Sequence, residues 1–270
     1  MPAAASADSS HTGLPAPDSP AHAKLIFWIA VAFSVYQVYT AAYAPLSSIV
    51  MRALHVGFLM LLTFTMLPRL GPRSTRGAWL GWILAIVGFT LGFYQGVFEE
   101  DLIVRSGELT TLDMMVGVIA LMLVFEAARR VMGPALPLIC AIFLAYALFG
   151  NYLPGTLAHR GFGFDQVINQ MAFGTEGIYG IPTYVSSTYI FLFILFGSFL
   201  EHAGMIRLFT DLAMGTVGHT RGGPAKVAVI SSGLMGTING SGVANVVTTG
   251  QFTIPLMKSF GFKPAFAGGV

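Results

Sequence analysis

The sequence predicts an all-α, polytopic integral membrane protein, a helical bundle that contains a re-entrant helical hairpin. Two observations concern the whole chain: 55% of its 270 residues are hydrophobic and only 10% are charged, whereas soluble domains carry about 25% charged residues. A third is local, because residues 224–257 form two short apolar arms around a polar, glycine-rich centre. A bundle of spanning helices with one interrupted segment accounts for all three observations.

Six stretches are suited to crossing a bilayer, which requires about 20 mostly apolar residues in a helix. In chain order they are 25–43, 50–67, 79–97, 112–128, 134–150 and 184–200. Residues 151–183 are more polar and are interrupted by prolines, so we expect them to lie along the outer interface. Residues 1–23 are rich in Ala, Ser and Pro and lack Lys and Arg, which predicts a disordered cytoplasmic tail and not a signal peptide.

Charged residues between the spans predict the orientation, because cytoplasmic loops collect Lys and Arg. Basic residues occur at Lys24, in the loop 68–78 and at the pair Arg129 and Arg130, whereas the loop 98–110 is mainly acidic. We therefore expect a multi-pass protein of a bacterial inner membrane with a cytoplasmic N-terminus. Glu126 lies one helical turn before the arginine pair, and this spacing favours a structural ion pair over a proton relay.

Composition also excludes several functions. A net charge of +2 with scattered basic residues is not typical of a nucleic-acid surface. The single cysteine, Cys140, excludes a disulfide framework and a thiolate metal site, and we expect it to be a small buried hydrophobe. The sequence has no nucleophile and base set typical of an enzyme. We expect no cofactor, and the apolar composition implies membrane lipids as partners.

The ends of the interrupted segment 224–257 resemble one another. Arg221 and Lys226 precede or begin it, and Lys258 and Lys263 follow it, so the charge rule places both ends in the cytoplasm. Neither arm alone has about 20 apolar residues. A re-entrant hairpin satisfies both observations.

The tip of this hairpin predicts a binding site, because irregular backbone at membrane depth is tolerated where protein buries it or where it lines a cavity. Ser, Thr and Asn supply neutral oxygens that suit a small cation, and glycines let carbonyl groups approach an ion. Half-helix N-termini add partial positive charge for an anionic solute. The hairpin has no Asp, Glu or His, which favours sodium over proton coupling.

A packing contact between small residues is the alternative, and Asn239 and Asn245 beside the glycines argue against it. The candidate sodium ligands are Gly240, Ser241 and Asn245. The full set of candidate ion- and solute-binding residues is Ser232, Gly236, Thr237, Asn239, Gly240, Ser241, Asn245 and Thr249.

Two stretches resemble a known family: "FLFILFGSFLEHAGMIRLFTDLA" at 191–213 and "RGGPAKVAVISSGLMGTINGSGVANVVTTGQFTIPLMKSFGFKPAFAGG" at 221–269. They are similar to the fused membrane component of TRAP transporters, tripartite ATP-independent periplasmic transporters, particularly the branch served by TAXI-type receptors. The resemblance implies a four-helix, small-subunit-like domain at 24–132, joined near Gly133 to the first part of a large transport subunit at 133–270.

The resemblance also implies a function. Relatives are elevator-type, sodium-driven importers of the ion-transporter superfamily, and they take a small organic anion, often a carboxylate, from a periplasmic TAXI-type solute-binding protein. Their large subunits normally have two inverted repeats, each with a hairpin, whereas this sequence stops at Val270 after the first. We therefore expect a fragment, a truncated gene model or one part of a split protein. A receptor-independent sodium symporter and a non-transporting membrane scaffold stay open as alternatives, and the residues do not identify the solute.

Overall fold

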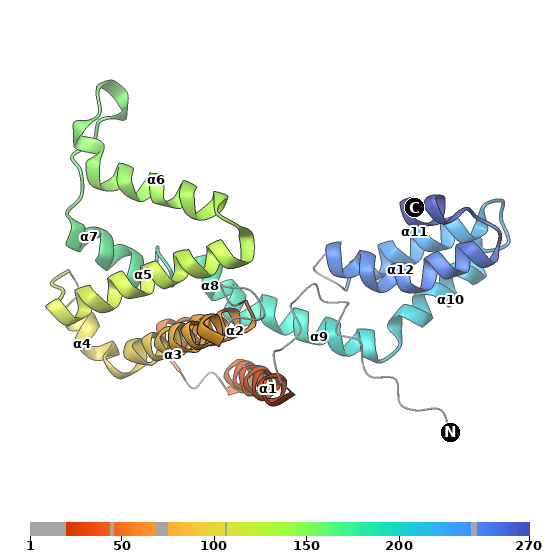
Figure 1. The fold of residues 1–270 in the computed structure, drawn as a ribbon, viewed down its shortest axis with the longest axis horizontal. Helices are drawn as coiled ribbons and strands as arrows, with labels where there is room; N and C mark the ends of the chain where they lie inside the picture. The colour runs from red at the N-terminus through yellow and green to blue at the C-terminus, as the bar shows by residue number, and fades with distance from the viewer. Residues whose placement is uncertain (1–19, 44–45, 68–74, 106, 239–241) are drawn as a thin grey trace. The chain divides into compact units, whose positions relative to one another are not determined.

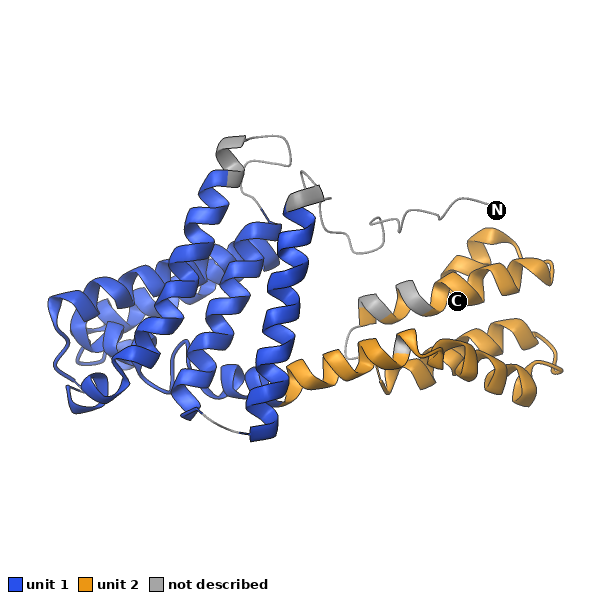
Figure 2. Ribbon diagram, turned by 90° about the horizontal axis from the view of Figure 1, so that it is seen from below, with its two compact units in different colours: residues 1–188 blue, residues 189–270 orange. Residues whose placement is uncertain are grey.

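The computed structural model describes residues 20–43, 46–67, 75–105, 107–238 and 242–270, and all regular structure in these ranges is helical (Figure 1). The α-helices are α1 (Pro20–Tyr43), α2 (Ser48–Met66), α3 (Thr75–Val97), α4 (Glu99–Val104), α5 (Thr111–Met132), α6 (Ala135–Phe149), α7 (Phe164–Ile168), α8 (Ile181–Val185), α9 (Phe191–His202), α10 (Met205–Val217), α11 (Gly223–Gly236), α12 (Gly242–Ser259) and α13 (Pro264–Gly269). Two 3₁₀ turns, η2 (Gly150–Tyr152) and η3 (Gly155–Leu157), and two π-helical segments, η4 (Asn169–Phe173) and η5 (Ser186–Ile190), complete the set. The chain divides into two compact units, residues 1–188 and 189–270 (Figure 2).

Six helical stretches of the described residues are long and apolar enough to cross a membrane. They are His22–Tyr43, Ser48–Met66, Trp79–Val97, Thr111–Met132, Ala135–Tyr152 and Ile181–Leu200. The largest difference from the predicted spans is at the end of the fourth, which was predicted at residue 128 and lies at Met132. The prediction of an all-α, polytopic membrane protein is therefore confirmed.

The structure corrects the end of the predicted tail and adds detail to one predicted loop. Helix α1 begins at Pro20, so residues 20–23 of the predicted tail are helical, because proline needs no amide partner in the first turn of a helix. Residues 1–19 lie outside the described residues. The predicted loop 98–110 contains the short helix α4, whose acidic first turn complements the positive end of the helix dipole.

Helices α2 and α3 lie side by side in the first unit (Figure 1), and glycines allow their close approach. A Cβ atom at Gly81 would lie 2.7 Å from the carbonyl oxygen of Phe64, and one at Gly92 would lie 2.6 Å from that of Ala53. Between helices in lipid, such close packing replaces the hydrophobic driving force available in water. Helix α5 completes a core made of Met60, Leu61, Phe64, Ala85, Leu91, Ala120 and Leu123.

Helix α6 contrasts with this core, because none of its residues is buried. Cys140 on this helix is exposed, so the expectation of a buried cysteine is wrong. The reason is that α6 packs along α5 and α7 and leaves most of its apolar circumference uncovered. Such a surface suits contact with lipid chains.

The segment between the fifth and sixth spans is broken into short helices and turns, in agreement with its interrupted sequence, and its location along the outer interface stays a prediction. Its α7 and η4 portion packs on α5, where a Cβ atom at Gly117 would lie 2.5 Å from Cγ2 of Ile168. This packing places the segment in the first compact unit. Gly133 lies between α5 and α6 and has a φ angle of +83°. The join between two domains near this residue stays a prediction.

Candidate ion and solute site

Helices α11 and α12 of the second unit form an antiparallel hairpin. Ala228 on α11 and Met257 on α12 belong to one buried apolar cluster, whereas nearer the break Ser232 contacts Asn245. Residue numbers rise along one arm as they fall along the other, so the arms run in opposite directions. The predicted helical hairpin is thus present, with arms that end at Gly236 and begin again at Gly242. Its entry and exit on one membrane face stay a prediction.

The side chain of Asn245 connects the two arms. Its Nδ2 atom donates to the carbonyl oxygen of Ser232 at 3.1 Å and to the Oγ atom of Ser232 at 3.2 Å. Gly236 lies opposite, where an added Cβ atom would be 3.6 Å from the same Nδ2 atom. The structure therefore brings three predicted site residues together just below the tip.

Hydroxyl groups continue down the same face of α12. The Oγ1 atom of Thr249 donates to the carbonyl oxygen of Asn245 at 2.7 Å, and the Oγ1 atom of Thr253 donates to that of Thr249 at 2.9 Å. Both threonines are buried. A hydroxyl that gives its hydrogen to its own helix keeps only acceptor lone pairs for other groups. These buried oxygens are therefore suited to a cation and not to another acceptor.

The remaining predicted residues are placed only in part. Thr237 follows α11 and is exposed, and its Oγ1 atom donates to the carbonyl oxygen of Leu234 at 2.6 Å. Asn239, Gly240 and Ser241 lie outside the described residues, so their ligand roles stay predictions.

Sequence reasoning missed two polar residues of this hairpin, Thr253 and Ser231. Ser231 is 2% exposed, and its Oγ atom lies 3.3 Å from the carbonyl oxygen of Ala228. Thr253 was recognisable from spacing, because Asn245, Thr249 and Thr253 follow one another at intervals of four residues, which places them on one helix face.

The described part of the hairpin carries formal charge only at its base. Lys226 lies in the first turn of α11, about 15 Å of helix from Gly236 at 1.5 Å per residue. Its Nζ atom donates to Thr220 Oγ1 at 3.1 Å. Lys258 lies in the last turn of α12. The field near the tip therefore comes from helix ends, with the positive end of α12 at Gly242.

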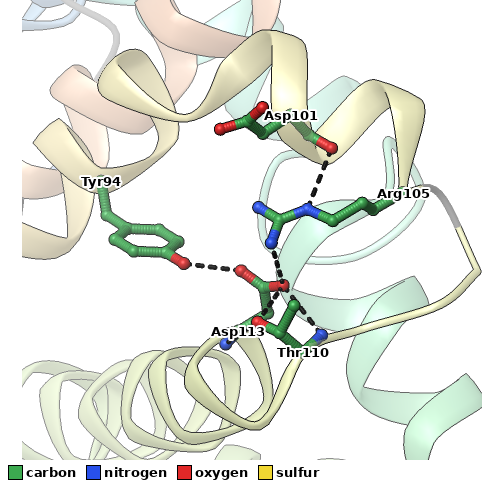
Figure 3. Close-up of polar contacts among 5 residues, drawn as sticks. All are labelled: Tyr94, Asp101, Arg105, Thr110 and Asp113. Atoms are coloured by element: carbon green, nitrogen blue, oxygen red, sulfur yellow. Dashed lines mark hydrogen bonds and ion pairs between the residues drawn. The ribbon is translucent and has the colours of Figure 1, made fainter.

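A buried carboxylate in the first unit, that of Asp113, has hydrogen-bond partners for both of its oxygen atoms (Figure 3). Asp113 is fully buried. Its Oδ1 atom accepts from Tyr94 Oη at 2.5 Å, and its Oδ2 atom accepts from the amide and hydroxyl of Thr110 at 2.9 and 2.6 Å. Arg105 lies 3.4 Å from Oδ2 and also donates to the carbonyl oxygen of Asp101 (Figure 3). Asp113 therefore completes the capping box of α5 with Thr110 and joins α5 to α3, which is a structural role.

The predicted ion pair at Glu126 is confirmed. The Nε atoms of Arg129 and Arg130 donate to its two carboxylate oxygens at 2.8 and 2.9 Å. Arg130 also donates to the carbonyl oxygen of Leu67 at 2.9 Å, which ties the end of α5 to the end of α2. Both carboxylate oxygens are occupied, as a structural pair requires.

Comparison with known families concerns the part of the chain that holds the hairpin. Residues 119–270, more than half of the chain, match the DctM component of the tripartite ATP-independent periplasmic transporters. The chain belongs to this family. The resemblance to TRAP transporters is thereby confirmed at the level of the permease component, while the fused four-helix organisation and the TAXI branch stay predictions.

Several TRAP permeases share a shorter stretch with the chain. The C4-dicarboxylate TRAP transporter large permease protein DctM of Rhodobacter capsulatus is 38% identical over 78 residues, and its Pseudomonas aeruginosa namesake is 37% identical over 78. The 2,3-diketo-L-gulonate TRAP transporter large permease protein YiaN of Escherichia coli is 31% identical over 78. Each match covers 29% of this chain and 18% of the relative's length. No solved structure matches the chain at comparable significance.

Proposed function

We propose that this chain is the membrane part of a sodium-coupled secondary transporter that imports a small organic anion delivered by a periplasmic TAXI-type receptor. The observation that carries the proposal is the row of buried threonine hydroxyls on α12, which starts one helical turn beyond Asn245, within the region that matches the permease family. The named relatives carry a C4-dicarboxylate or a diketo sugar acid, and both are organic anions.

Sodium as the coupling ion is supported by the chemistry of these side chains. The hairpin 224–257 has no carboxylate and no imidazole, so no side chain in it exchanges a proton readily near neutral pH. Hydroxyl and carbonyl oxygens are hard ligands, which suit a small cation without titrating. The carbonyl end of α11 at Gly236 suits a sodium ion, whereas the positive end of α12 at Gly242 suits the carboxylate of the solute.

The transport direction requires an orientation, which is also part of the proposal. We place the N-terminus in the cytoplasm, the loop 98–110 in the periplasm and both ends of the hairpin in the cytoplasm of a bacterial inner membrane. Reporter fusions after Lys226 and after Lys263 should both give cytoplasmic signals. Opposite signals would mean that the segment crosses the membrane, and the hairpin topology would be wrong.

The function is tested by uptake into proteoliposomes that contain the complete transporter, with a panel of labelled dicarboxylates and keto acids. We expect uptake only when an inward sodium gradient and the receptor are both present. Potassium in place of sodium, and a proton gradient alone, serve as controls. Uptake driven by the proton gradient would refute sodium coupling, and sodium-driven uptake without the receptor would indicate a receptor-independent symporter.

A further inference from the structure

Four polar side chains of the N-terminal helices contact one later segment of the same unit. Gln95 Nε2 donates to the carbonyl oxygen of Ala172 at 3.0 Å, and Gln37 Nε2 donates to that of Ser187 at 3.1 Å. Arg52 Nη1 donates to the carbonyl oxygen of Tyr179 at 2.6 Å, and His55 Nε2 lies 3.0 Å from Ser186 Oγ. These donor and acceptor residues are 77 to 150 positions apart in the sequence.

The acceptor atoms show which group donates in each of these hydrogen bonds. The carbonyl oxygen of Ser187 can only accept, so the atom of Gln37 that contacts it is the amide nitrogen. The same nitrogen lies 2.7 Å from Nδ1 of His55, which must therefore be the accepting nitrogen of a neutral imidazole. The hydrogen of that imidazole is then on Nε2, which donates to Ser186 Oγ.

Two of the acceptors belong to π-helical segments. Ala172 lies in η4, which ends before Gly174, and carbonyl groups in the last turn of a helix have no amide partner within it. Ser187 lies in η5, where the change from i−4 to i−5 bonding leaves carbonyl groups in need of other donors. The two glutamines supply such donors, and both are nearly fully buried, with exposures of 4% and 1%.

The turn between these segments is held in the same way. Arg52, which donates to Tyr179, also lies over the ring of Tyr184, with its Cζ atom 4.8 Å from the ring centroid. Tyr179 is 3% exposed, and burial raises the pKa of its hydroxyl above the ordinary value. The bond from Arg52 to the carbonyl oxygen of Tyr179 is partly buried, and shielding from water strengthens a hydrogen bond electrostatically.

All four donors lie near one end of the bundle. Gln37 is six residues before the end of α1, Arg52 and His55 are in the first two turns of α2, and Gln95 is two residues before the end of α3. Successive antiparallel spans bring these ends to one membrane face. The family match begins at residue 119, so every donor precedes it and every acceptor lies within it.

We propose that Gln37, Arg52, His55 and Gln95 form a polar joint by which the N-terminal helices hold the permease segment 169–187. Three of the four acceptors are backbone carbonyl oxygens. The joint therefore recognises the shape of the permease backbone at its π-helical turns and depends little on the side chains there.

In a lipid bilayer, hydrogen bonds of this kind help to determine which helices associate. Apolar surfaces pack against lipid chains almost as well as against another helix, so hydrogen bonds and close packing determine which helices associate. The η5 segment runs directly into α9, the first long helix of the second unit. The joint therefore fixes the backbone at the point where the chain leaves the first unit.

Hydrogen–deuterium exchange on the full chain in nanodiscs tests the joint. Methionine matches glutamine in length and lacks the amide, so Gln95→Met should raise exchange about tenfold at the amides of Gly174 and Ile178, with amides after Ser187 unchanged. Gln37→Met should raise exchange after Ser187 only. Tenfold corresponds to about 1.4 kcal/mol, the scale of one buried hydrogen bond with its unsatisfied acceptor.

Two matched controls separate this effect from general destabilisation. Thr90 on α3 and Ser34 on α1 bond only to carbonyl groups of their own helices, so Thr90→Val and Ser34→Ala should leave exchange in 169–192 unchanged. Unchanged exchange in both glutamine variants, or an equal increase throughout the chain including α11, would overturn the joint.

A second measurement uses a protease site inserted at Gly133 of the full chain. After cleavage, the two halves of the otherwise native protein should co-elute from size exclusion in mild detergent, whereas the halves of a Gln37→Met/Gln95→Met variant should separate. If the native halves separate, or if the variant halves stay together, the joint does not hold the two parts. If the double variant fails to fold, the exchange data on the single variants decide.

Discussion

The two buried glutamines of the first unit donate to distant segments, whereas the polar side chains of the hairpin bond mostly to their own helix. Gln37 and Gln95 donate to carbonyl oxygens 150 and 77 residues away. Thr249 and Thr253 donate to carbonyl oxygens four residues earlier, and Asn245 supplies the hydrogen bonds from α12 to α11. The two glutamines and the two threonines are buried, but the glutamine donors are used in long-range bonds whereas the threonine oxygens can still accept.

The difference indicates two kinds of polar burial in a membrane protein. Side-chain donors that bond to distant backbone carbonyl groups have no further bonding capacity, and they fix the packing of the segments that they join. Hydroxyls that donate locally keep their acceptor lone pairs, and they cost little to bury because their hydrogens are already bonded. The first kind suits a stationary joint, and the second suits a site that binds and releases a cation.

The largest effect on the free energy of unfolding should follow the loss of a polar side chain whose hydrogen bonds all stabilise the fold. Asp113→Ala removes the carboxylate half of the capping box of α5 and leaves Tyr94 and Arg105 without their shared acceptor, which should lower the free energy of unfolding by about 3 kcal/mol. Chemical unfolding of the purified chain measures it. Asp101→Ala is the control, because only its backbone oxygen accepts from Arg105. Equal stability of the two variants would contradict the structural role.

A hairpin substitution should instead change transport. Asn245→Leu removes two hydrogen bonds to Ser232 and a candidate sodium ligand, worth together about 2 kcal/mol, or roughly thirtyfold in sodium-dependent uptake. Gln251→Leu is the matched control, since Gln251 is an exposed amide on the same helix. Uptake that is reduced equally in both variants would mean that Asn245 has no particular role.

The ion pair at Glu126 provides an intermediate case. Glu126→Gln keeps hydrogen-bonding atoms but removes the charge. Because the ion pair lies near the surface at the end of the helix, the free energy of unfolding should fall by about 1 kcal/mol. Sodium and pH dependence of uptake should match the unaltered protein. A changed pH dependence of uptake would revive the proton-relay role that the spacing disfavoured.

A predicted effect of similar size, on sodium affinity and not on stability, concerns Ser241. Ser241→Ala removes one neutral oxygen, so apparent sodium affinity should fall severalfold, the equivalent of about 1 kcal/mol, with normal expression. Ser259→Ala is the control, because that exposed hydroxyl bonds within the last turn of α12. Sodium titration of uptake distinguishes them, and identical affinities would exclude Ser241 as a ligand.

Much of this fold could be predicted because bilayer thickness and composition determine the length and position of each span. The hairpin was also predictable, since its glycines, asparagines and flanking lysines all lie within one short segment. Its partner contact, Asn245 with Ser232, follows once two antiparallel arms are assumed.

The polar joint could not be predicted in this way. Gln37, His55 and Gln95 were visible as polar residues within apolar spans, and a buried amide at such a position requires a partner. The partners are backbone carbonyl groups, however, and every residue has one, so the sequence does not show which of them accept these bonds. The π-helical turns at 169–173 and 186–190 likewise depend on contacts made across more than 70 residues.

The separation of donors from acceptors also has a consequence for biosynthesis. At about 5–20 residues per second, the ribosome finishes Ser187 roughly 8 to 30 s after Gln37. During that interval the amide nitrogen of Gln37 needs temporary acceptors, and its position six residues from the end of α1 keeps it within reach of interfacial water. Insertion of the first three helices and completion of their packing are therefore separate events in the synthesis of the chain.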